Sequence, residues 1–434
     1  MDFEQLQDAG GQVGRFEPVP DQDLPHSCKA GGSSGNNEGS SGFDVSVKYS
    51  GEYDAAIAGG GPAGLACAIA AAQRGLRVVV VDGRKPPIDK ACGEGLMPDT
   101  LAALAELGVQ LTPEVGFPMR GIRFLNGAQH AEAEFPGTEP AGKELMGNGL
   151  GLGVKRVVLH ERLLERAAEL GVEFRWQTAI QGIEQGSEGA TLWTNKGGVR
   201  ARFVVGADGH QSRVRAAAGL EDARVSGRRI GLRQHFEIAP WTTFVEVYWS
   251  DFGQAYVTPV GPEEVCVAFL AQTKIPSILS ALDCYPELRA RLAGAPRSDA
   301  ARGSVTISRR LERVTRGRVA LAGDASGSVD AVTGEGLSLC FRQALVLAEA
   351  MQTKDLAGYE RAHRGMLRMP HLMASTLLLL DRSPRLRSCA IGTLGRLPWV
   401  FERLLAAHIG DFGLTKYAAT VSVWSDQLAA MSLL

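Results

Sequence analysis

A glycine cluster at residues 59–64 constrains this chain more than any other feature of its sequence. The cluster follows the short apolar run Asp54–Ala58 and opens the apolar stretch Leu65–Gln73. A second apolar run, Leu76–Asp82, comes next. Short apolar runs bounded by glycines are typical of buried parallel strands, and the longer stretch between them is typical of a helix. The sequence therefore predicts a βαβ unit and places the chain in the α/β class.

The spacing of the glycines, G-x-G-x-x-G, predicts a dinucleotide site within this unit. Gly59 allows a tight turn, Gly61 lets the backbone approach a pyrophosphate, and Gly64 lets helix and strand pack closely. The free N–H groups at the start of the helix attract phosphate. Asp82 ends the second strand, where we expect it to accept hydrogen bonds from a ribose. The alternative is a glycine turn in an unrelated α/β fold.

Composition and motif content exclude several other classes. The 46 Lys and Arg residues nearly balance the 48 Asp and Glu residues, so no nucleic-acid partner is expected. The 7 cysteines are odd in number and never spaced C-x-x-C, which indicates a reducing compartment and no zinc site. The histidines form no H-E-x-x-H, so no metal is expected. No apolar run reaches the roughly 18 residues of a transmembrane helix, and we expect a cytoplasmic protein.

Three local elements are predicted from the remaining pattern. The second glycine cluster, Gly147–Gly153, has no buried strand before it and no acid-tipped strand after it, which favours a flexible loop over a second nucleotide site. The apolar pattern predicts one strand over residues 172–180 and one helix over residues 355–380.

Three further segments carry a family resemblance. Val204–Arg215 resembles the GADG-x-x-S-x-V-R segment of flavoprotein hydroxylases, and Arg318–Ala325, followed by Thr333–Gly336, resembles their GDA segment. With the first glycine cluster, these motifs occur in the order found in the para-hydroxybenzoate-hydroxylase-like flavoprotein superfamily. Lys90–Pro98 is most similar to the branch that contains geranylgeranyl-reductase-like dehydrogenases and antibiotic-pathway hydroxylases.

The resemblance implies that the dinucleotide is FAD. Asp324 ends a predicted buried strand, where a carboxylate is costly unless it is paired or exposed to a ligand, and the family's aspartate holds the ribityl chain. The helix that starts near Thr333 would direct its N-terminus at the flavin ring. Arg156 matches a family arginine near the cofactor, although a surface arginine is an equal alternative. The cofactor-binding residues added by the resemblance are Arg156, Asp208, Gly323, Asp324, Gly334 and Gly336.

The pattern and the resemblance together predict a Rossmann-like FAD-binding domain with an inserted antiparallel-sheet substrate domain and a helical C-terminus. The predicted boundaries are a disordered tail at 1–50, the first part of the FAD-binding domain at 51–225, the substrate-binding sheet at 226–315, the return segment of the FAD-binding domain at 316–355, and the helical C-terminal region at 356–434. The tail is acidic and rich in glycine and serine, so it cannot bury enough apolar surface to fold.

The sequence assigns no residue to the chemical step, but three residues are candidates. Cys92 lies in a glycine-flanked turn that the family packs near the flavin, and it is either redox-active or simply small. Arg233 and His235 alternate along a predicted strand and therefore share one face, which points either toward a substrate or toward solvent.

The resemblance implies an FAD-dependent oxidoreductase, and an NAD(P)H-dependent monooxygenase of an aromatic or polyketide-like small molecule fits it best. NAD(P)H is expected to bind transiently as electron donor. Reductases of isoprenoid double bonds carry Y-x-W-x-F-P, and Ala255–Gly261 lacks that tryptophan and phenylalanine, so double-bond reduction is the first alternative. A flavin-binding protein without turnover is the second. The arginine-rich apolar C-terminal stretch is expected to cap a domain, with peripheral contact to a membrane as the alternative.

Overall fold

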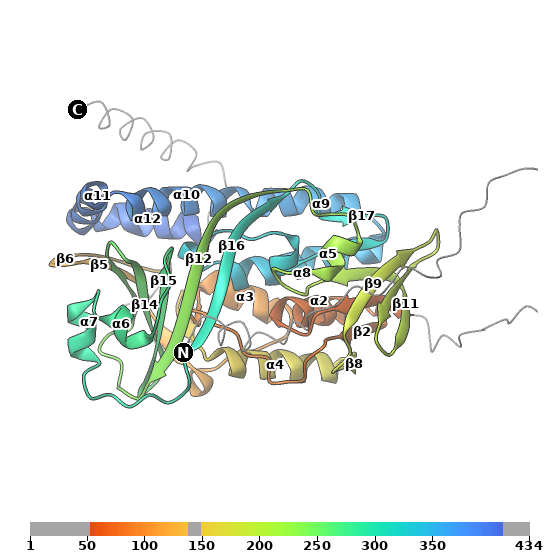
Figure 1. The fold of residues 1–434 in the computed structure, drawn as a ribbon, viewed down its shortest axis with the longest axis horizontal. Coiled ribbons are helices and arrows are strands. Elements are labelled where there is room, and N and C mark those ends of the chain that lie inside the picture. The colour runs from red at the N-terminus through yellow and green to blue at the C-terminus, as the bar shows by residue number, and fades with distance from the viewer. Residues whose placement is uncertain (1–52, 138–148, 411–434) are drawn as a thin grey trace, which may run out of the picture. The chain divides into compact units, whose positions relative to one another are not determined.

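The structure is a computed structural model that describes residues 53–137 and 149–410. The predicted tail at 1–50 lies outside the described residues, as does the chain after residue 410. Two large sheets and the helices that cover them organise the described part of the chain (Figure 1).

The first sheet has a parallel centre in the order β18-β11-β1-β2-β8. Its strands are β1 (Tyr53–Ala58), β2 (Val78–Val81), β8 (Glu173–Arg175), β11 (Gly197–Gly206) and β18 (Val319–Leu321). Antiparallel partners extend it: β17 (Thr315–Arg316) beside β18, and β9 (Ile180–Gln185) with β10 (Ala190–Thr194) beside β11. β2 is four valines, all buried, as expected of a parallel strand that is covered on both faces.

Helices cover this sheet and complete the predicted βαβ unit. α2 (Pro62–Gln73) connects β1 to β2 and begins with a proline, which is pre-organised for the first helical position. It is apolar almost all round because it packs against both α4 (Arg156–Glu169) and α8 (Gly336–Thr353). The remaining helices of this part are α3 (Pro98–Glu106), α5 (Arg213–Ala217) and α9 (Leu356–Met366), with a short 3-10 turn η1 (Pro113–Val115).

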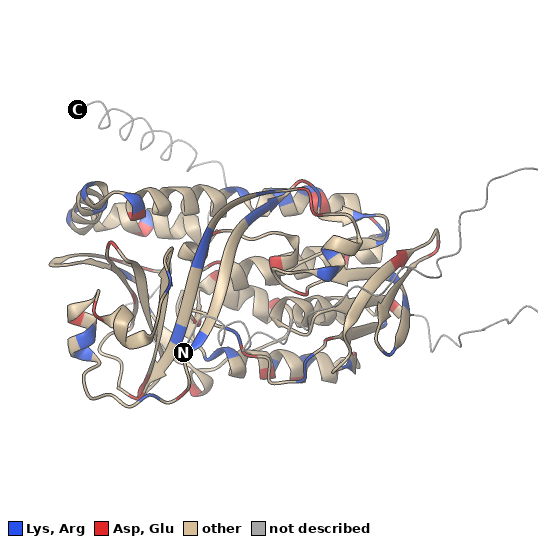
Figure 2. Ribbon diagram, viewed as in Figure 1, with Lys and Arg blue, Asp and Glu red and all other residues tan. Residues whose placement is uncertain are grey.

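The second sheet has the order β16-β12-β15-β14-β13-β5-β6, and all neighbours are antiparallel except β13 and β5. Its strands are β5 (Gly121–Asn126), β6 (Gln129–Glu134), β12 (Ala223–Phe236), β13 (Phe244–Trp249), β14 (Gly253–Gly261), β15 (Glu264–Ala271) and β16 (Arg302–Leu311). The insertion expected at 226–315 therefore supplies five of the strands, whereas β5 and β6 come from an earlier segment. Basic residues recur along β12 (Figure 2).

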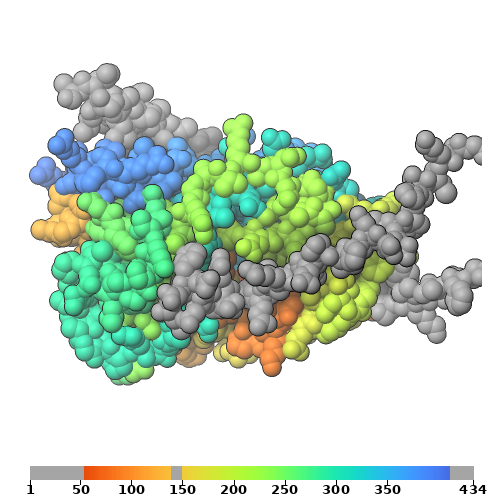
Figure 3. All heavy atoms as spheres, viewed as in Figure 1, coloured from red at the N-terminus to blue at the C-terminus, as the bar shows by residue number. Residues whose placement is uncertain are grey.

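The two faces of the second sheet are covered by different helices. Along β13, Tyr248 packs with α6 (Ile278–Leu282) and α7 (Pro286–Arg291), whereas Val247 and Trp249 pack with the C-terminal helices. This alternation follows the two-residue period of a strand. The C-terminal helices are α10 (Arg368–Arg382), α11 (Pro384–Arg396) and α12 (Pro398–His408). In Figure 3 these blue helices lie against the orange strand pair β5–β6, in agreement with the packing of α11 and α12 on β6.

The structure corrects three local predictions. The strand expected at 172–180 ends at Arg175, because Gln177 adopts a positive φ before β9 starts. The helix expected at 355–380 is two helices, α9 and α10, that meet at Leu367. The loop expected at Gly147–Gly153 contains a strand, β7 (Gly151–Gly153), between β3 (Gly95–Leu96) and β4 (Phe117–Met119).

The glycines of β7 are needed for packing. A Cβ on Gly153 would lie 1.7 Å from the carbonyl oxygen of Pro259, so only glycine lets β7 pass this close to β14. Residues 147 and 148 of the same cluster lie outside the described part. In the described part, none of the helices combines the length and the apolar character that a membrane crossing needs.

Candidate functional site

The three glycine-containing motifs meet at one edge of the first sheet. The last residues of neighbouring strands pair directly: Val81 with Ala58, Ala58 with Gly206, and Gly206 with Leu321. One of the three motifs lies at the end of each of β1, β11 and β18. These ends form the carboxyl edge of the sheet, where ligands bind in open α/β sheets. Parallel strands thus bring together segments that are far apart in the sequence.

The glycine turn of residues 59–64 is close-packed at its ends and open in its middle. A Cβ on Gly59 would lie 2.4 Å from the carbonyl oxygen of Ala207, and one on Gly64 would lie 1.8 Å from the carbonyl oxygen of Gly59. A Cβ on Gly61 would meet no described atom within 4 Å. Gly61 is also the N-cap of α2, and no side chain of the described residues caps that helix. Its first N–H groups are therefore available to an anion.

Asp82 and a histidine brace this turn. The Asp82 carboxylate accepts hydrogen bonds from the backbone N–H of Gly60 and of Arg84, both at 2.7 Å. His160, which is buried on α4, contacts the carbonyl oxygen of Gly60 at 2.8 Å through Nε2. Burial lowers the pKa of His160, so the neutral imidazole donates this hydrogen bond. The sequence did not point to His160.

Asp324 lies beside the turn and contacts Lys90 and His210, the second of which has its pKa lowered by burial. It belongs to the 3-10 turn η2 (Gly323–Ser326) that follows β18. Its carboxylate lies 3.0 Å from Lys90 Nζ and 3.1 Å from His210 Nε2. Burial alone would raise the pKa of Asp324, but the charges of Lys90 and His210 outweigh it and hold that pKa below its usual value. A Cβ on Gly323 would lie 2.6 Å from the Ala63 side chain, so η2 directly contacts the start of α2.

Arg156 also contributes to this charged group. It opens α4, and its positive charge is among those that lower the pKa of Asp324. Its Nε is buried and has no hydrogen-bond partner among the described residues. A buried donor without a partner is costly, and a bound anionic or carbonyl group would satisfy it.

Asp208 has a structural task in the observed fold. Its carboxylate accepts hydrogen bonds from the Ser212 hydroxyl and from the backbone N–H groups of Arg213, at 2.7 Å, and Val214, at 3.2 Å. These contacts cap the start of α5.

The turn before α8 leaves open space at both of its glycines. It follows a short 3-10 turn, η3 (Ala331–Thr333), and Gly334 has the left-handed φ of 71° that favours glycine. A Cβ on Gly334 or on Gly336 would meet no described atom within 4 Å. The Tyr256 hydroxyl donates to the carbonyl oxygen of Val332 at 3.1 Å and thereby connects β14 to this turn.

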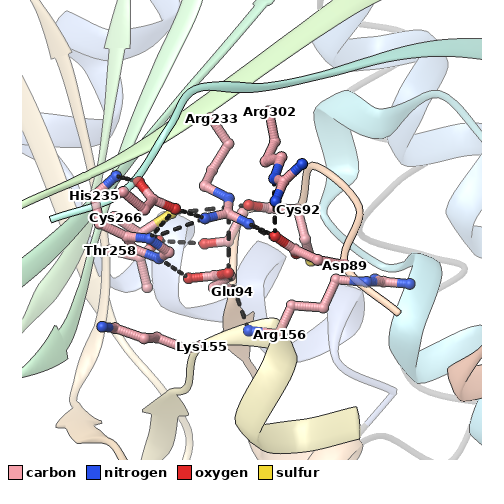
Figure 4. A network of polar contacts seen from close by, with 12 residues as sticks. Asp89, Cys92, Glu94, Lys155, Arg156, Arg233, His235, Thr258, Cys266 and Arg302 are labelled. Carbon is pink, nitrogen blue, oxygen red and sulfur yellow. Dashed lines mark hydrogen bonds and ion pairs between the residues drawn. The ribbon is translucent and has the colours of Figure 1, made fainter. Parts of the chain in front are cut away.

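Arg233 and His235 lie in a buried network of charges instead of on an open face (Figure 4). Arg233 donates to Asp89 at 2.8 Å and to Asp299 at 2.5 Å. The two ring nitrogens of His235 lie 2.6 Å from Glu94 Oε2 and 2.9 Å from Asp299 Oδ2. The predicted shared face is confirmed, since Arg233 Nη1 lies 2.9 Å from His235 Nδ1. A solvent-facing role is wrong, because both side chains are buried.

The charges around His235 favour a proton on each ring nitrogen. Both nitrogens face carboxylate oxygens, which accept, although Nδ1 also lies 2.9 Å from the donor Arg233 Nη1. Burial by itself would lower the pKa of His235, but the hydrogen bond and charge of Glu94 outweigh it and the pKa is raised. Asp299 Oδ2 then accepts from both His235 Nδ1 and Arg233 Nη1.

This protonation also argues against a metal at the cluster. Glu94, His235 and Cys266 offer ligand atoms within 4.8 Å of one another. A metal ligand must present a lone pair, and both nitrogens of His235 use protons to pair with acids. We therefore assign the cluster to ion pairing.

Glu94 connects the two sheets and was missed by sequence reasoning. Its Oε1 accepts from the backbone N–H of Arg156 at 3.0 Å, which caps α4, while Oε2 pairs with His235 on β12. The residue lies between two glycines, has a φ of 61° and is 2% exposed. A non-glycine residue at positive φ is uncommon and often marks a functional turn. Cys92, two residues earlier, is half-buried, and its carbonyl oxygen accepts from the Cys266 thiol at 3.8 Å.

Residues 52–277 match the family described as an FAD binding domain. The chain is 26% identical to the menaquinone reductase of Mycolicibacterium smegmatis, over 79% of this chain and 91% of the reductase. It is 28% identical to the 12-dehydrotetracycline 5-monooxygenase/anhydrotetracycline 6-monooxygenase of Streptomyces rimosus, over 77% of this chain and 71% of that enzyme. Among solved structures, p-nitrophenol 4-monooxygenase of Pseudomonas putida has a TM-score of 0.70 at 22% identity, over 83% of this chain and 97% of that chain.

Proposed function

Because the chain belongs to the FAD binding domain family and is an FAD-dependent oxidoreductase, we propose that it is an NAD(P)H-dependent monooxygenase of an aromatic or polyketide-like small molecule. Bound FAD supplies the transfer of electrons between the donor and the substrate. The protein binds and orients the cofactor and excludes water from it.

The residues at the edge of the first sheet fit FAD. The open space at Gly61 and the uncapped start of α2 suit a pyrophosphate, and Asp82 suits a ribose. The unpartnered Nε of Arg156 is a buried donor in need of an acceptor. We propose that Asp324, kept ionised by Lys90 and His210, accepts hydrogen bonds from the ribityl hydroxyls.

The character of β14 supports oxygenation over isoprenoid reduction. Its single aromatic residue, Tyr256, is partly buried and hydrogen-bonded to the turn before α8. Gln254 donates to Asp381, and Thr258 donates to the carbonyl oxygen of Gly93 at 2.7 Å. This strand therefore uses its polar side chains for internal contacts and presents no aromatic wall to an isoprenoid chain.

Reduction of an isoprenoid double bond is the second candidate. It is favoured by the match to menaquinone reductase, which extends over 91% of that enzyme. Oxygen labelling separates the two reactions. Purified protein is incubated with NADPH and labelled dioxygen against a panel of phenols, polyketides and prenyl quinones. A product with one labelled oxygen atom supports the monooxygenase. A product with two added hydrogens and no label assigns the reductase, and FAD binding without any turnover assigns a flavin-binding protein.

We expect NAD(P)H to bind only transiently near Asp208, and we expect the protein to act in the cytoplasm, where reduced nicotinamides are available. The six cysteines among the described residues are free thiols, in agreement with a reducing compartment. Anaerobic stopped-flow reduction of the flavin by NADPH and by NADH identifies the donor.

An exposed stripe on α10 supports peripheral contact with an anionic lipid surface. Leu372 and Leu379 are 45% and 52% exposed, and Arg368 and Arg382 lie at the two ends of the same helical face. Apolar side chains flanked by arginines suit a negatively charged interface. The double variant Leu372→Ser with Leu379→Ser should lose co-sedimentation with phosphatidylglycerol vesicles, whereas Leu279→Ser, an exposed leucine on α6, should retain it. Equal binding by both proteins would remove the lipid surface from the proposal.

A further inference from the structure

The turn before α8 carries a buried carboxyl group, one oxygen of which has no hydrogen-bond donor among the described residues. Glu335 is the N-cap of α8 and is 5% exposed. Its Oε2 has no hydrogen-bond partner among the described residues. Nδ1 of His408, at the end of α12, lies 3.7 Å from this oxygen. That nitrogen is buried and also lacks a hydrogen-bond partner in the described part of the chain.

The other nitrogen of His408 defines which ring atom carries the proton. Nε2 lies 3.1 Å from the carbonyl oxygen of Thr333, which can only accept, so Nε2 donates. Burial lowers the pKa of His408 to about 4, so near neutral pH the imidazole is neutral and Nδ1 presents a lone pair. Two buried polar atoms therefore face each other, one a carboxyl oxygen and the other a proton acceptor.

The surroundings favour the protonated carboxyl group. Burial is the main cause, together with the negative charge of Asp99 on α3, and raises the pKa of Glu335 to about 8. The Asp99 carboxylate accepts from the Ser338 hydroxyl on α8. Thr333 and the positive charge of Arg342, also on α8, act in the opposite direction and are outweighed. Near neutral pH the Glu335 carboxyl group holds a proton and His408 Nδ1, 3.7 Å away, holds none, so the pair is uncharged.

We propose that Glu335 and His408 form a proton-holding pair that sets the electrostatic charge behind the N-terminus of α8 and thereby tunes how tightly the protein binds FAD as pH changes. The proposal rests on the placement of FAD at this turn, which is part of the proposed function. Glu335 acts here as a positioning residue, because it influences the cofactor through the helix end and does not react.

The expected direction follows from the helix dipole. With Glu335 protonated, the positive end of α8 is unopposed and favours the electron-rich edge of the flavin. Loss of the proton places a full negative charge at this end, where it cancels the dipole and repels an anionic ligand. The dissociation constant of FAD should therefore rise between pH 7 and pH 9, by roughly two- to fivefold.

The test measures the dissociation constant of FAD by flavin fluorescence from pH 6 to pH 9.5. Glu335→Gln keeps a neutral side chain of the same size, so its FAD affinity should stay flat and should exceed the wild-type affinity at pH 9. Glu349→Gln removes an exposed carboxylate from the same helix and should follow the wild-type curve. The midpoint potential of the flavin is measured over the same pH range. The change that it shows at alkaline pH in the wild type should be absent in Glu335→Gln.

Stability gives a readout that does not depend on FAD. Because the folded-state pKa of Glu335 is raised above its ordinary value of 4.5, ionisation opposes folding, and the apo protein loses stability as pH rises from about 4.5 to about 8. Glu335→Gln should remove this loss. If the glutamine variant does not fold, His408→Gln, which can still donate to Thr333, should shift the alkaline midpoint of the FAD curve.

Three outcomes bear on the inference. A wild-type curve that weakens at alkaline pH and a flat Glu335→Gln curve support it. If the wild type and Glu335→Gln bind FAD with the same pH dependence, the proposed role of the Glu335–His408 pair is wrong and the proposed function remains. Wild-type protein that binds no FAD overturns both.

Discussion

The glycine turn at residues 59–64 and the network of buried charges around Glu94 differ in how their polar groups are partnered. The turn is a contiguous run of six residues with open space at Gly61 and uncapped N–H groups. The network draws Glu94, Arg233 and Asp299 from three distant segments, and its acids and bases pair with one another, with only Arg233 Nε lacking a hydrogen-bond partner among the described atoms of these three residues (Figure 4). An open site with unpartnered donors is ready for a ligand, whereas a closed set of ion pairs is suited to hold a structure in place.

The segment 89–94 shows how the two regions are connected. Asp89 and Glu94, at its ends, pair with β12 of the second sheet, and Lys90 pairs with Asp324 at the edge of the first. The same segment carries Cys92. The closed network thus positions a loop that faces the open site, and separate variants can disturb either region alone.

Removal of the charge on Glu94 should cause the largest loss of stability. Glu94→Gln leaves His235 and Arg233 buried without one of their carboxylates and should lower the free energy of unfolding by about 3 kcal/mol. Urea unfolding of the apo protein at pH 7 measures it. Glu188→Gln, on an exposed turn of the first sheet, should unfold like the wild type. A change below about 1 kcal/mol for Glu94→Gln would mean that the network contributes little.

A side chain that fills the open space at Gly61 should weaken FAD binding and leave the stability of the fold unchanged. Gly61→Val should weaken FAD by about 10- to 100-fold, since the added side chain occupies the place of the pyrophosphate. Equilibrium binding measures the affinity. Gly182→Val is a matched control, because a Cβ there also meets no described atom within 4 Å and lies on β9, away from the turn. Full FAD retention by Gly61→Val would refute the placement.

Asp208 tests whether a residue beside the open site is structural. Asp208→Ala removes two of the hydrogen bonds that cap the start of α5, leaves the N-cap Ser212 in place, and should cost about 1 kcal/mol of stability. FAD content should stay near that of the wild type. Thermal unfolding with parallel flavin absorbance distinguishes the two effects, and a variant that loses FAD at unchanged stability would instead place Asp208 in contact with the cofactor.

The smallest expected effect is a change of stability with pH that is caused by the titration of His235. Its folded-state pKa is raised, so its stabilisation is complete below the ordinary value of 6.5 and is lost as pH rises through the folded pKa. The apo protein should therefore become somewhat less stable above neutral pH, beyond the part caused by Glu335. His235→Gln should flatten this part of the stability curve. If the wild type and the variant show parallel curves, His235 does not titrate in that range.

Features that depend on the spacing of residues close together in the sequence could be predicted. The order of β1, α2 and β2 and the close packing of Gly64 against Gly59 follow from neighbours within a few residues, whereas the close approach of Ala207 to Gly59 is set by the pairing of β1 with β11. Local spacing misled at Gly151–Gly153, because a glycine run is usually a loop, whereas this run pairs with β3 and β4 and the close approach of Pro259 requires glycine at position 153.

The charged network could not be predicted, because its members are far apart in the chain. Glu94 and His235 are separated by 141 positions, and nothing in the sequence pairs them. The alternation of Arg233 and His235 correctly put them on one face, yet a strand pattern does not say whether that face meets water or three carboxylates.

The sequence by itself determined that this chain builds a strand–turn–helix edge for a dinucleotide, because glycine spacing limits the backbone locally and leaves only a few turns possible. The tertiary structure alone decided which buried charges are paired and which protons they keep. Desolvation and Coulomb interactions depend on the distances between atoms, and for Glu94, His235 and Glu335 those distances exist only after the strands and helices have packed.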